Sequence, residues 1–294
     1  MKIKYFLVFS FVVCFVSVTS CQKDFTVSEP ETKIVSSLDS NYLDKIYYIN
    51  NGDTNYMIKY FYDNLKRVIK MENINHLTAT LTDIDSVLYY YNSNDTMPFK
   101  SKGIYNIRFT SSSHSIDTTY SYFFYLNNNR VRDSILNYSA NPNLPYQKNI
   151  VSYNYVANKI FSKTIIYNSP NASSLGYVFS LDTLILDNDK NIISAKKFFP
   201  SQGLFNSTFT YDSHPNPFYK LSNHFALDII PEVSDITEEQ VPSKNNLLTA
   251  NQDYNNYILD YTGRYTYGLN GYPKEINDSY SGTVLKYFFT YKAL

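Results

Sequence analysis

The sequence predicts an all-β fold in which antiparallel hairpins form one rolled meander. Tyrosine occurs 31 times and phenylalanine 20 times among 294 residues, while glycine occurs only 8 times and tryptophan is absent. Aromatic and β-branched residues favour the pleated, half-buried surface of a sheet. Asparagine lies between the apolar runs, where its side chain bonds local backbone and tolerates left-handed turns. This alternation extends over residues 42–294, which indicates a single all-β domain there.

Four pairs of apolar runs have the length and spacing of β-hairpins, and each has a short polar turn that fixes strand register. The predicted pairs are 56–62 with 67–71, 120–126 with 131–138, 150–156 with 160–167, and 181–186 with 192–199. The interval from Asn223 to about Ala250 breaks this pattern, as functional or mobile connections often do. We expect one short helix near residues 236–241, and strands that resume at Tyr254 and continue to Tyr291.

Residues 1–20 have the pattern of a secretory signal peptide. Lys2 and Lys4 form a basic start, an uncharged apolar run follows, and Val18-Thr19-Ser20-Cys21 ends it. The run of about 14 residues is shorter than the roughly 20 that a transmembrane helix needs. The last four residues resemble a bacterial lipobox, which implies cleavage before Cys21 and acylation of its thiol, for example with palmitate. Residues 21–41 would then be the lipidated cysteine and a flexible tether.

Gln22, Lys23 and Asp24 resemble the export signals that carry Bacteroidota lipoproteins to the outer face of the outer membrane. Phe25 departs from the further acidic residues usual there, and an ordinary solvated start of the tether is the alternative. We therefore expect an outer-membrane lipoprotein on the cell surface or on the periplasmic face. Cys14 leaves with the signal, so the mature domain contains no disulfide.

The charge balance excludes a strongly basic protein. The chain has 26 Lys and Arg residues against 26 Asp and Glu residues, and two of the lysines leave with the signal. This balance gives no electrostatic case for nucleic acid, which favours a clustered basic face. The expected partners are the membrane, through the lipid anchor, and a glycan or protein ligand, but no nucleic acid.

Several hairpins share a loose unit: an aromatic residue, any residue and tyrosine, then Asp or Gly, a polar turn and a return strand. Residues 60–68 resemble the YD repeat of the RHS type, with Lys66 where a glycine is usual, and residues 265–273 keep the glycine at Gly271 but lack the aspartate. Three further segments, 211–218, 243–246 and 271–274, are similar to segments of uncharacterised Bacteroidota lipoproteins with YD/RHS-like β-hairpin repeats. The resemblance implies a rolled antiparallel sheet on a lipid anchor, without catalytic residues.

No stretch has the spacing of an established catalytic or metal site. Residues 187–191 begin like a calcium loop, but Ile192 and Phe198 replace the required glycine and glutamate, so a hairpin turn is favoured. Asp83 and Asp85 would share one face of a strand, as glycoside hydrolysis could use, but any acidic turn offers as much. The histidines lack metal-ligand spacing and are interpreted as loop and surface residues: His76, His114, His214 and His224. We expect no metal, no cofactor and no enzymatic activity.

Five Asp-Ser/Thr triplets, each ending in an apolar residue or Thr, are similar to the O-glycosylation acceptor of Bacteroidota. The candidate acceptors are Ser86, Thr96, Thr118, Ser134 and Thr183. Composition alone would give about one such triplet, and glycans there would be bulky and solubilising. The alternative is that Asp-Ser and Asp-Thr mark turn-to-strand transitions.

These features favour a non-enzymatic, lipid-anchored envelope protein with a binding or adhesion role. Exposed tyrosines can stack on sugars or anchor a protein, although tyrosine also fills solvent-facing strand positions without a function. The alternatives are a structural or assembly component of the outer envelope with protein partners only, and a glycoside-processing enzyme.

Overall fold

A computed structural model describes residues 42–50, 53–78, 81–110, 113–127, 129–139, 145–168, 175–222, 243–254, 257–280 and 283–294. The chain divides into two units, residues 1–36 and residues 37–294, and all described residues belong to the second. The predicted signal peptide, Cys21, the export residues, the tether, His224 and the helix expected near residues 236–241 lie outside the described residues.

The described part contains sixteen strands and one short helix. The first eight strands are β1 (Tyr42–Asn50), β2 (Asp53–Tyr62), β3 (Val68–Thr78), β4 (Leu81–Tyr91), β5 (Pro98–Thr110), β6 (Ser113–Leu126), β7 (Asn129–Tyr138) and β8 (Gln147–Val156). They are followed by β9 (Lys159–Tyr167), β10 (Tyr177–Leu186), β11 (Ile192–Phe199), β12 (Gly203–Pro215), α1 (Pro217–Ser222), β13 (Asn245–Tyr254), β14 (Tyr257–Tyr267), β15 (Pro273–Tyr280) and β16 (Thr283–Lys292). Within these residues, no helix has the length and apolar character that crossing a membrane requires.

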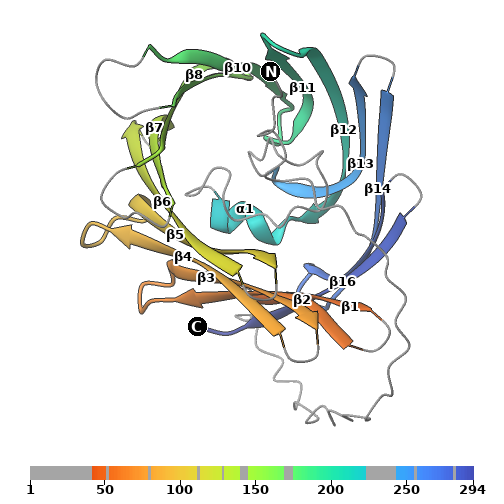
Figure 1. Cartoon of the computed structure of the whole chain (residues 1–294). Coiled ribbons are helices and arrows are strands. Elements are labelled where there is room, and N and C mark those ends of the chain that lie inside the picture. The colour runs from red at the N-terminus through yellow and green to blue at the C-terminus, as the bar shows by residue number, and fades with distance from the viewer. Residues whose placement is uncertain are drawn as a thin grey trace. The chain divides into compact units, whose positions relative to one another are not determined.

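The sheet is a closed antiparallel barrel (Figure 1). Each strand pairs with its neighbour in sequence, and β1 pairs with β16, where Tyr48 lies opposite Tyr287. The predicted all-β meander is confirmed, but the expected rolled sheet is wrong, because closure leaves no edge to protect. An open and a closed meander share every hairpin and differ in one strand pair, so the local sequence pattern is the same for both.

The four predicted hairpins are confirmed as β2–β3, β6–β7, β8–β9 and β10–β11. The predicted break after residue 222 is too long, since β13 already begins at Asn245. The asparagine-rich sequence of β13 has little β-propensity, and pairing with β12 and β14 determines this strand instead. The helix α1 was not predicted either. It begins with Pro217 at its first position, and Asn216 caps it by accepting a hydrogen bond from the N–H of Phe218 at 2.9 Å.

Inner and outer faces are distinguished by α1, which lies inside the ring of strands (Figure 1). Phe218 packs against Phe289 and belongs to a buried cluster with inward residues of β1 to β4 and β13 to β16, among them Ile46, Tyr60 and Tyr261. Because side chains alternate along a strand and match across each pair, strand register extends this assignment around the barrel. A second buried cluster, Ile160, Leu184, Ile192 and Ala195, lines the inner face of β9 to β11.

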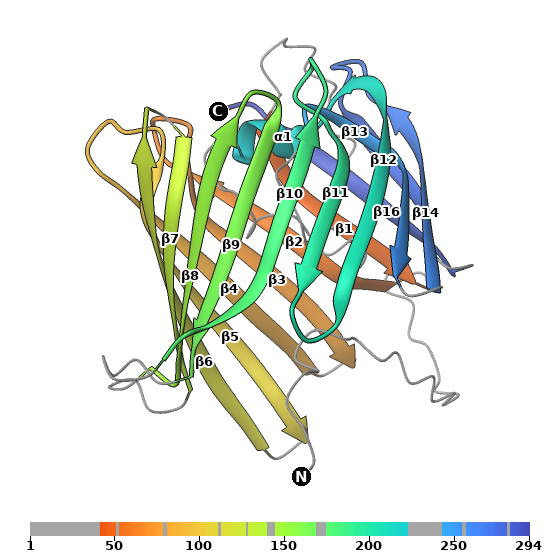
Figure 2. The ribbon, with the colours of Figure 1, turned by 90° about the horizontal axis from the view of Figure 1, so that it is seen from above.

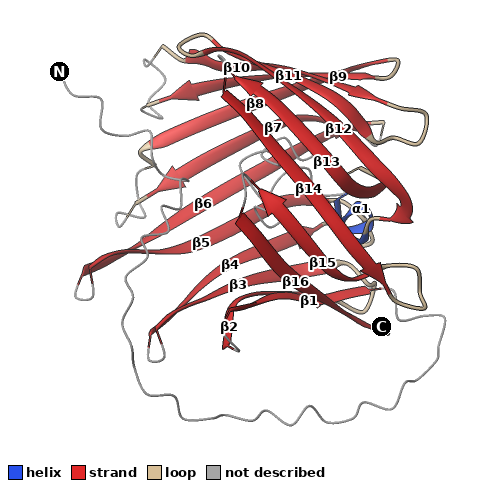
Figure 3. Cartoon of the chain, turned by 90° about the vertical axis from the view of Figure 1, so that its right-hand side faces the viewer, coloured by secondary structure: helices blue, strands red, loops and turns tan. Residues whose placement is uncertain are grey.

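The turns from even-numbered to odd-numbered strands all lie at one end of the barrel, because neighbouring strands run in opposite directions. We call this end the helix rim, since α1 lies beside it (Figures 2 and 3). The helix rim includes the turns 63–67, 92–97, 187–191 and 268–272. Most of the candidate site lies at this end.

Candidate functional site

A repeated tyrosine contact stabilises the helix rim. In six even-numbered strands, a tyrosine near the strand's end donates a hydrogen bond to a backbone carbonyl near the start of the preceding odd-numbered strand. The pairs are Tyr62 to Leu43 (2.7 Å), Tyr91 to Val68 (2.7 Å), Tyr125 to Pro98 (3.1 Å), Tyr211 to Ile192 (2.7 Å), Tyr265 to Leu247 (2.9 Å) and Tyr291 to Pro273 (2.7 Å). Burial raises the pKa of Tyr62 and of Tyr211, so these hydroxyls remain protonated donors.

Three turns of the helix rim share one backbone geometry. In residues 63–67, 187–191 and 268–272, the first N–H donates to the fifth carbonyl, and the fourth N–H donates to the first carbonyl. The fourth residue has a positive φ: 63° at Lys66, 71° at Lys190 and 77° at Gly271. This left-handed position explains why the sequence unit favours glycine there.

The aspartate of the sequence unit closes the same turn with its side chain. Asp63 Oδ1 accepts a hydrogen bond from the N–H of Arg67 at 3.0 Å, and Asp187 Oδ1 accepts one from the N–H of Asn191 at 2.9 Å. The prediction of a hairpin turn at 187–191 is therefore confirmed.

Among the described residues, no three histidine, cysteine or acidic side chains lie close enough together to hold a metal ion.

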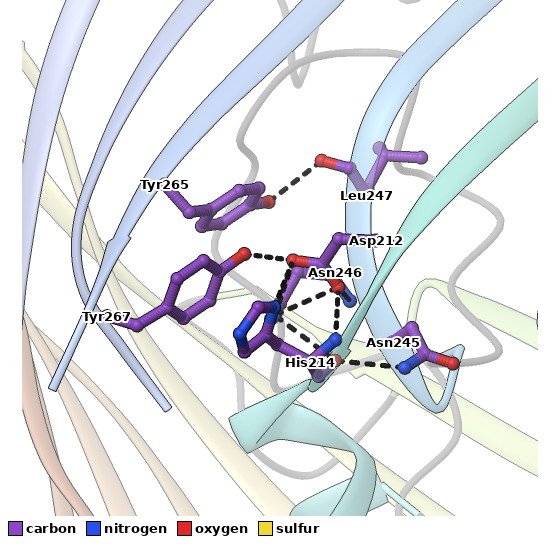
Figure 4. A network of polar contacts seen from close by, with 7 residues as sticks. All are labelled: Asp212, His214, Asn245, Asn246, Leu247, Tyr265 and Tyr267. Atoms are coloured by element: carbon purple, nitrogen blue, oxygen red, sulfur yellow. Dashed lines mark hydrogen bonds and ion pairs between the residues drawn. The ribbon is translucent and has the colours of Figure 1, made fainter. Parts of the chain in front are cut away.

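A polar cluster joins β12, β13 and β14 at the helix rim (Figure 4). We call it the Asp212 cluster; it consists of Asp212, His214, Asn245, Asn246, Leu247, Tyr265 and Tyr267. Asp212 accepts hydrogen bonds from the N–H of His214 (2.9 Å), the N–H of Asn246 (3.1 Å), the Asn246 side-chain amide (3.2 Å) and the Tyr267 hydroxyl. Burial, together with the bond to Asp212, raises the pKa of Tyr267, so this donor keeps its proton.

His214 is the one histidine whose side chain the structure describes. Its ring stacks on Tyr267 with centroids 3.7 Å apart, and its Nδ1 lies 3.9 Å from Asp212 Oδ2. The side chain is 43% exposed. The expectation of loop and surface histidines is wrong in its loop part for three of the four, because His76, His114 and His214 lie on β3, β6 and β12. Their strands contain many polar residues, which made the positions look like loops. The exposure of His214 confirms the surface part for this residue.

Further hydrogen bonds next to the Asp212 cluster hold both ends of the connection between β12 and β13, which contains α1. Asn245 and Asn191 exchange two hydrogen bonds, N–H to Oδ1 at 2.9 Å and Nδ2 to Oδ1 at 3.0 Å. The Ser243 hydroxyl accepts from the N–H of Ile192 at 3.0 Å, and the Ser243 carbonyl accepts from the Asn216 side chain at 3.1 Å. The segments 211–218 and 243–246, singled out in the sequence, thus meet here. The cluster's geometry is that of a brace for α1.

A shallow hollow of about 570 Å³ lies next to this brace. Its lining residues are Asp187, Asp189, Asn191, Ile193, Phe209, Thr210, Tyr211, Asp212, Ser213, Pro215, Lys244 and Asn245. Lys244 and Asp189 form an exposed ion pair at 3.2 Å. Rings next to amides and carboxylates suit a polar ligand that also has an apolar face.

The outer wall of the barrel differs between its two halves. On β4 to β11, the basic side chains that the structure describes at outward positions are Lys100, Lys102, Arg132, Lys148, Lys159, Lys163 and Lys196. None of the described outward positions on these strands holds an acidic residue. We call this half the lysine face. On the other half, Lys70 pairs with Glu72 at 2.6 Å and Lys286 with Glu275 at 2.9 Å.

Four of the five candidate acceptors lie within strands and face outward. They are Ser86 on β4, Thr118 on β6, Ser134 on β7 and Thr183 on β10, whereas Thr96 is exposed in the turn after β4. The preceding aspartates, Asp85, Asp117, Asp133 and Asp182, face inward. The turn-to-strand interpretation is therefore wrong for these four triplets, which lie in mid-strand because the alternation of a strand places Asp inside and Ser or Thr outside.

Asp83 and Asp85 both face inward on β4, so the predicted shared face is confirmed. Asp85 Oδ1 accepts a hydrogen bond from the N–H of Asn106 at 2.7 Å. Burial, and secondarily the charge of Asp83, raises the pKa of Asp85. Asp83 itself is only 8% exposed, which places this pair within the inner wall.

No family model and no curated protein matches the chain. Among solved structures, a porin-like protein from Bacteroides vulgatus has a TM-score of 0.42 and 10% identity, over 86% of this chain and 99% of that one. A porin-like protein from Bacteroides uniformis has a TM-score of 0.47 and 12% identity, over 85% of this chain and 98% of that one. Both TM-scores lie below 0.5, so nothing about function is transferred from these proteins.

Proposed function

We propose that the chain is a non-enzymatic, lipid-anchored protein of the cell envelope whose barrel stands in water and serves as a binding module. The mostly polar outward rows of β12 to β15 carry this proposal. Most described outward positions on β12 to β15 hold polar residues, and Leu204 is an apolar exception. The polar residues include Asn206, Thr208, Thr210, Thr249, Asn251, Asp260, Thr262, Arg264, Thr266, Glu275 and Asn277. Hydroxyl, amide and charged groups in such rows favour contact with water.

The lysine face favours water for the same reason. Lys163 and Lys196 face outward at the middle of β9 and β11. A strand that faces lipid needs an apolar outer row, and each Lys or Arg at the middle of a bilayer costs about 2–4 kcal/mol. Attachment to the outer membrane is then left to the lipid on Cys21, with Gln22, Lys23 and Asp24 directing export.

A binding role is supported better than a catalytic one. The Asp212 carboxylate already accepts bonds from two backbone amides, an asparagine side chain and Tyr267, which occupies the oxygens a general base would use. The hollow next to it and the ring-rich outer wall offer surfaces for a glycan or a protein.

The test separates the anchor from the barrel. Membranes from cells that make the full chain are extracted with alkaline carbonate and compared with membranes containing Cys21→Ser. We expect the native chain to stay in the membrane and the variant to appear in the soluble fraction, because acylation is the one attachment. Retention of Cys21→Ser in the membrane fraction would show that the barrel itself is embedded in the membrane and would contradict the proposal. Protease shaving of intact cells then distinguishes the cell surface from the periplasmic face.

A second candidate is an assembly component with protein partners, and exposed leucines at the helix rim favour it. Leu65, Leu126 and Leu269 are 54%, 63% and 101% exposed. Apolar side chains that stand in water at one end suit a protein interface. A photocrosslinking residue at position 269 should give a discrete adduct in living cells, whereas one at Leu204 on the outer wall should not. Equal labelling at both positions would argue against a rim interface.

A further inference from the structure

We infer that the lysine face binds an acidic polysaccharide. This inference rests on the proposed function, since it requires the outer wall to stand in water. It names the ligand class of the binding module and places the site on β4 to β11, away from the Asp212 cluster.

Charge is sorted across the wall of β4 to β11. The seven basic residues of the lysine face point outward, while five acidic residues of the same strands point inward: Asp83, Asp85, Asp117, Asp133 and Asp182. Two basic residues, Arg130 and Lys197, also point inward. Asp133 is fully buried and accepts hydrogen bonds from Arg130 and the Tyr153 hydroxyl, so its charge is paired inside the barrel. Half of the outer wall therefore presents positive charge although the whole chain is nearly neutral.

On the other half of the wall, two outward lysines are paired with glutamates. There, Lys70 and Lys286 each lie within 3 Å of a glutamate on the same face, at 2.6 and 2.9 Å. The strands of the lysine face provide no outward carboxylate for such a pair among their described residues. The positive charge is thus available to an external anion.

Aromatic rings are interleaved with these charges. Lys100 Nζ lies 4.7 Å from the ring centroid of Tyr120, 5.2 Å from that of Tyr122 and 5.7 Å from that of Tyr90. The Arg132 guanidinium lies 5.3 Å from the ring of Phe124. Such rings hold a cation by its attraction to the π-face and still offer apolar area to a ligand. A sugar ring with a carboxylate or sulfate group matches both features, because its C–H face stacks on the ring and its anion pairs with the lysine.

The shape of the wall selects a flexible chain as the ligand. The outside of a barrel is convex, so a flat bilayer can touch only a few neighbouring strands at once. Single-stranded nucleic acid is bound in positively charged grooves. Among the outward side chains that the structure describes on these strands, the forked guanidinium that suits phosphate occurs once, at Arg132. A polysaccharide can follow the curve and contact basic residues on several strands, because neighbouring strands lie about 4.8 Å apart.

The test uses the full lipidated chain in nonionic detergent, with polygalacturonate as the probe and neutral dextran as its control. We expect saturable calorimetric binding of polygalacturonate that weakens with added salt, and no binding of dextran. The variant Lys100→Gln/Lys102→Gln should bind about tenfold more weakly. The matched variant Lys45→Gln/Lys286→Gln removes two outward lysines of β1 and β16, on the other half of the wall, and should bind within about twofold of the native chain. Equal melting temperatures would show that both variants fold.

Four outcomes would overturn the inference: no binding at low salt, equal binding of dextran, equal weakening in both double variants, or tighter binding of single-stranded oligonucleotides or anionic vesicles than of polygalacturonate. These outcomes are independent of the extraction test. If Cys21→Ser is released and polygalacturonate does not bind, the proposal that the barrel stands in water is still supported, and only the assignment of the ligand fails. If Cys21→Ser stays in the membrane, the proposed function fails first.

Discussion

The Tyr62 hydroxyl lies 2.7 Å from the carbonyl oxygen of Leu43, and this bond joins the end of β2 to the start of β1. Five further tyrosines make the equivalent contact around the helix rim. Each bond adds to the strand ladder a side-chain contact that reaches back to the preceding strand. The rim therefore resists fraying at the strand ends, where ladder bonds are fewest.

Removing one of these hydroxyls should lower stability measurably. Tyr62→Phe keeps the ring but leaves the buried Leu43 carbonyl without this donor, so we expect the free energy of unfolding to fall by about 1 kcal/mol. Tyr90→Phe, on the outer wall, is the control and should change it by less than about 0.5 kcal/mol. Urea unfolding measures both. Equal effects of the two substitutions would contradict a special role for the rim bond.

The hairpins could be predicted because their turns have a local cause. The tyrosine and aspartate at 62 and 63 are adjacent in sequence, and the left-handed residue follows at Lys66, so the unit is visible in the sequence without any tertiary contact. Closure could not be predicted in this way. Tyr48 and Tyr287 pair across the whole length of the domain, and no local pattern indicates that the first and last strands meet.

The left-handed turn position gives a second prediction, at Gly271. Its φ is 77°, and a Cβ placed there would meet no atom within 4 Å, so substitution strains the backbone without a clash. Gly271→Ala should lower the free energy of unfolding by about 1–2 kcal/mol. Gly271→Asn should cost clearly less, because asparagine tolerates this conformation. Thermal unfolding of both variants tests this; an asparagine variant as unstable as the alanine variant would contradict it.

The candidate site was harder to predict than the hairpins because β-bulges reset the alternation of side chains. Register shifts in β12 between Thr210 and Tyr211, and again before Pro215, so counting along the strand does not place Asp212 and His214. Asn246, which donates a hydrogen bond to Asp212, also lies 34 residues later in the sequence, beyond the long connection. The sorted charges of the lysine face could not be predicted for a different reason: composition reports only the near-zero sum of the charges, and not the face of the sheet on which each charge lies.

Exposure leads us to expect glycan at one of the five candidate acceptors. Thr96 is exposed in a turn, whereas Ser86, Thr118, Ser134 and Thr183 are half-buried between neighbouring side chains of the outer wall. A transferase acting on the folded chain can reach a turn more readily than a row within a sheet. The intact mass of the native protein should therefore exceed that of the bare acylated chain by one glycan, and Thr96→Ala should remove it. An unmodified mass would end the glycosylation hypothesis, and glycan on the strand residues would contradict the exposure argument.

A buried carboxyl on β15 makes the stability of the barrel depend on pH. Asp278 faces inward and is 1% exposed, and burial raises its pKa to about 7. The unfolded chain releases this proton near pH 4, so between about pH 4 and pH 7 the folded state retains a proton that the unfolded state has lost. The free energy of unfolding should therefore fall as pH rises through this window, by about 2–3 kcal/mol from pH 5 to pH 8. Asp278→Asn should lack this component and exceed the native chain in stability at pH 8, while the exposed Asp260→Asn should behave as the native chain does. Urea unfolding at both pH values decides it, because parallel pH dependence in native and Asp278→Asn proteins would rule Asp278 out as the titrating group.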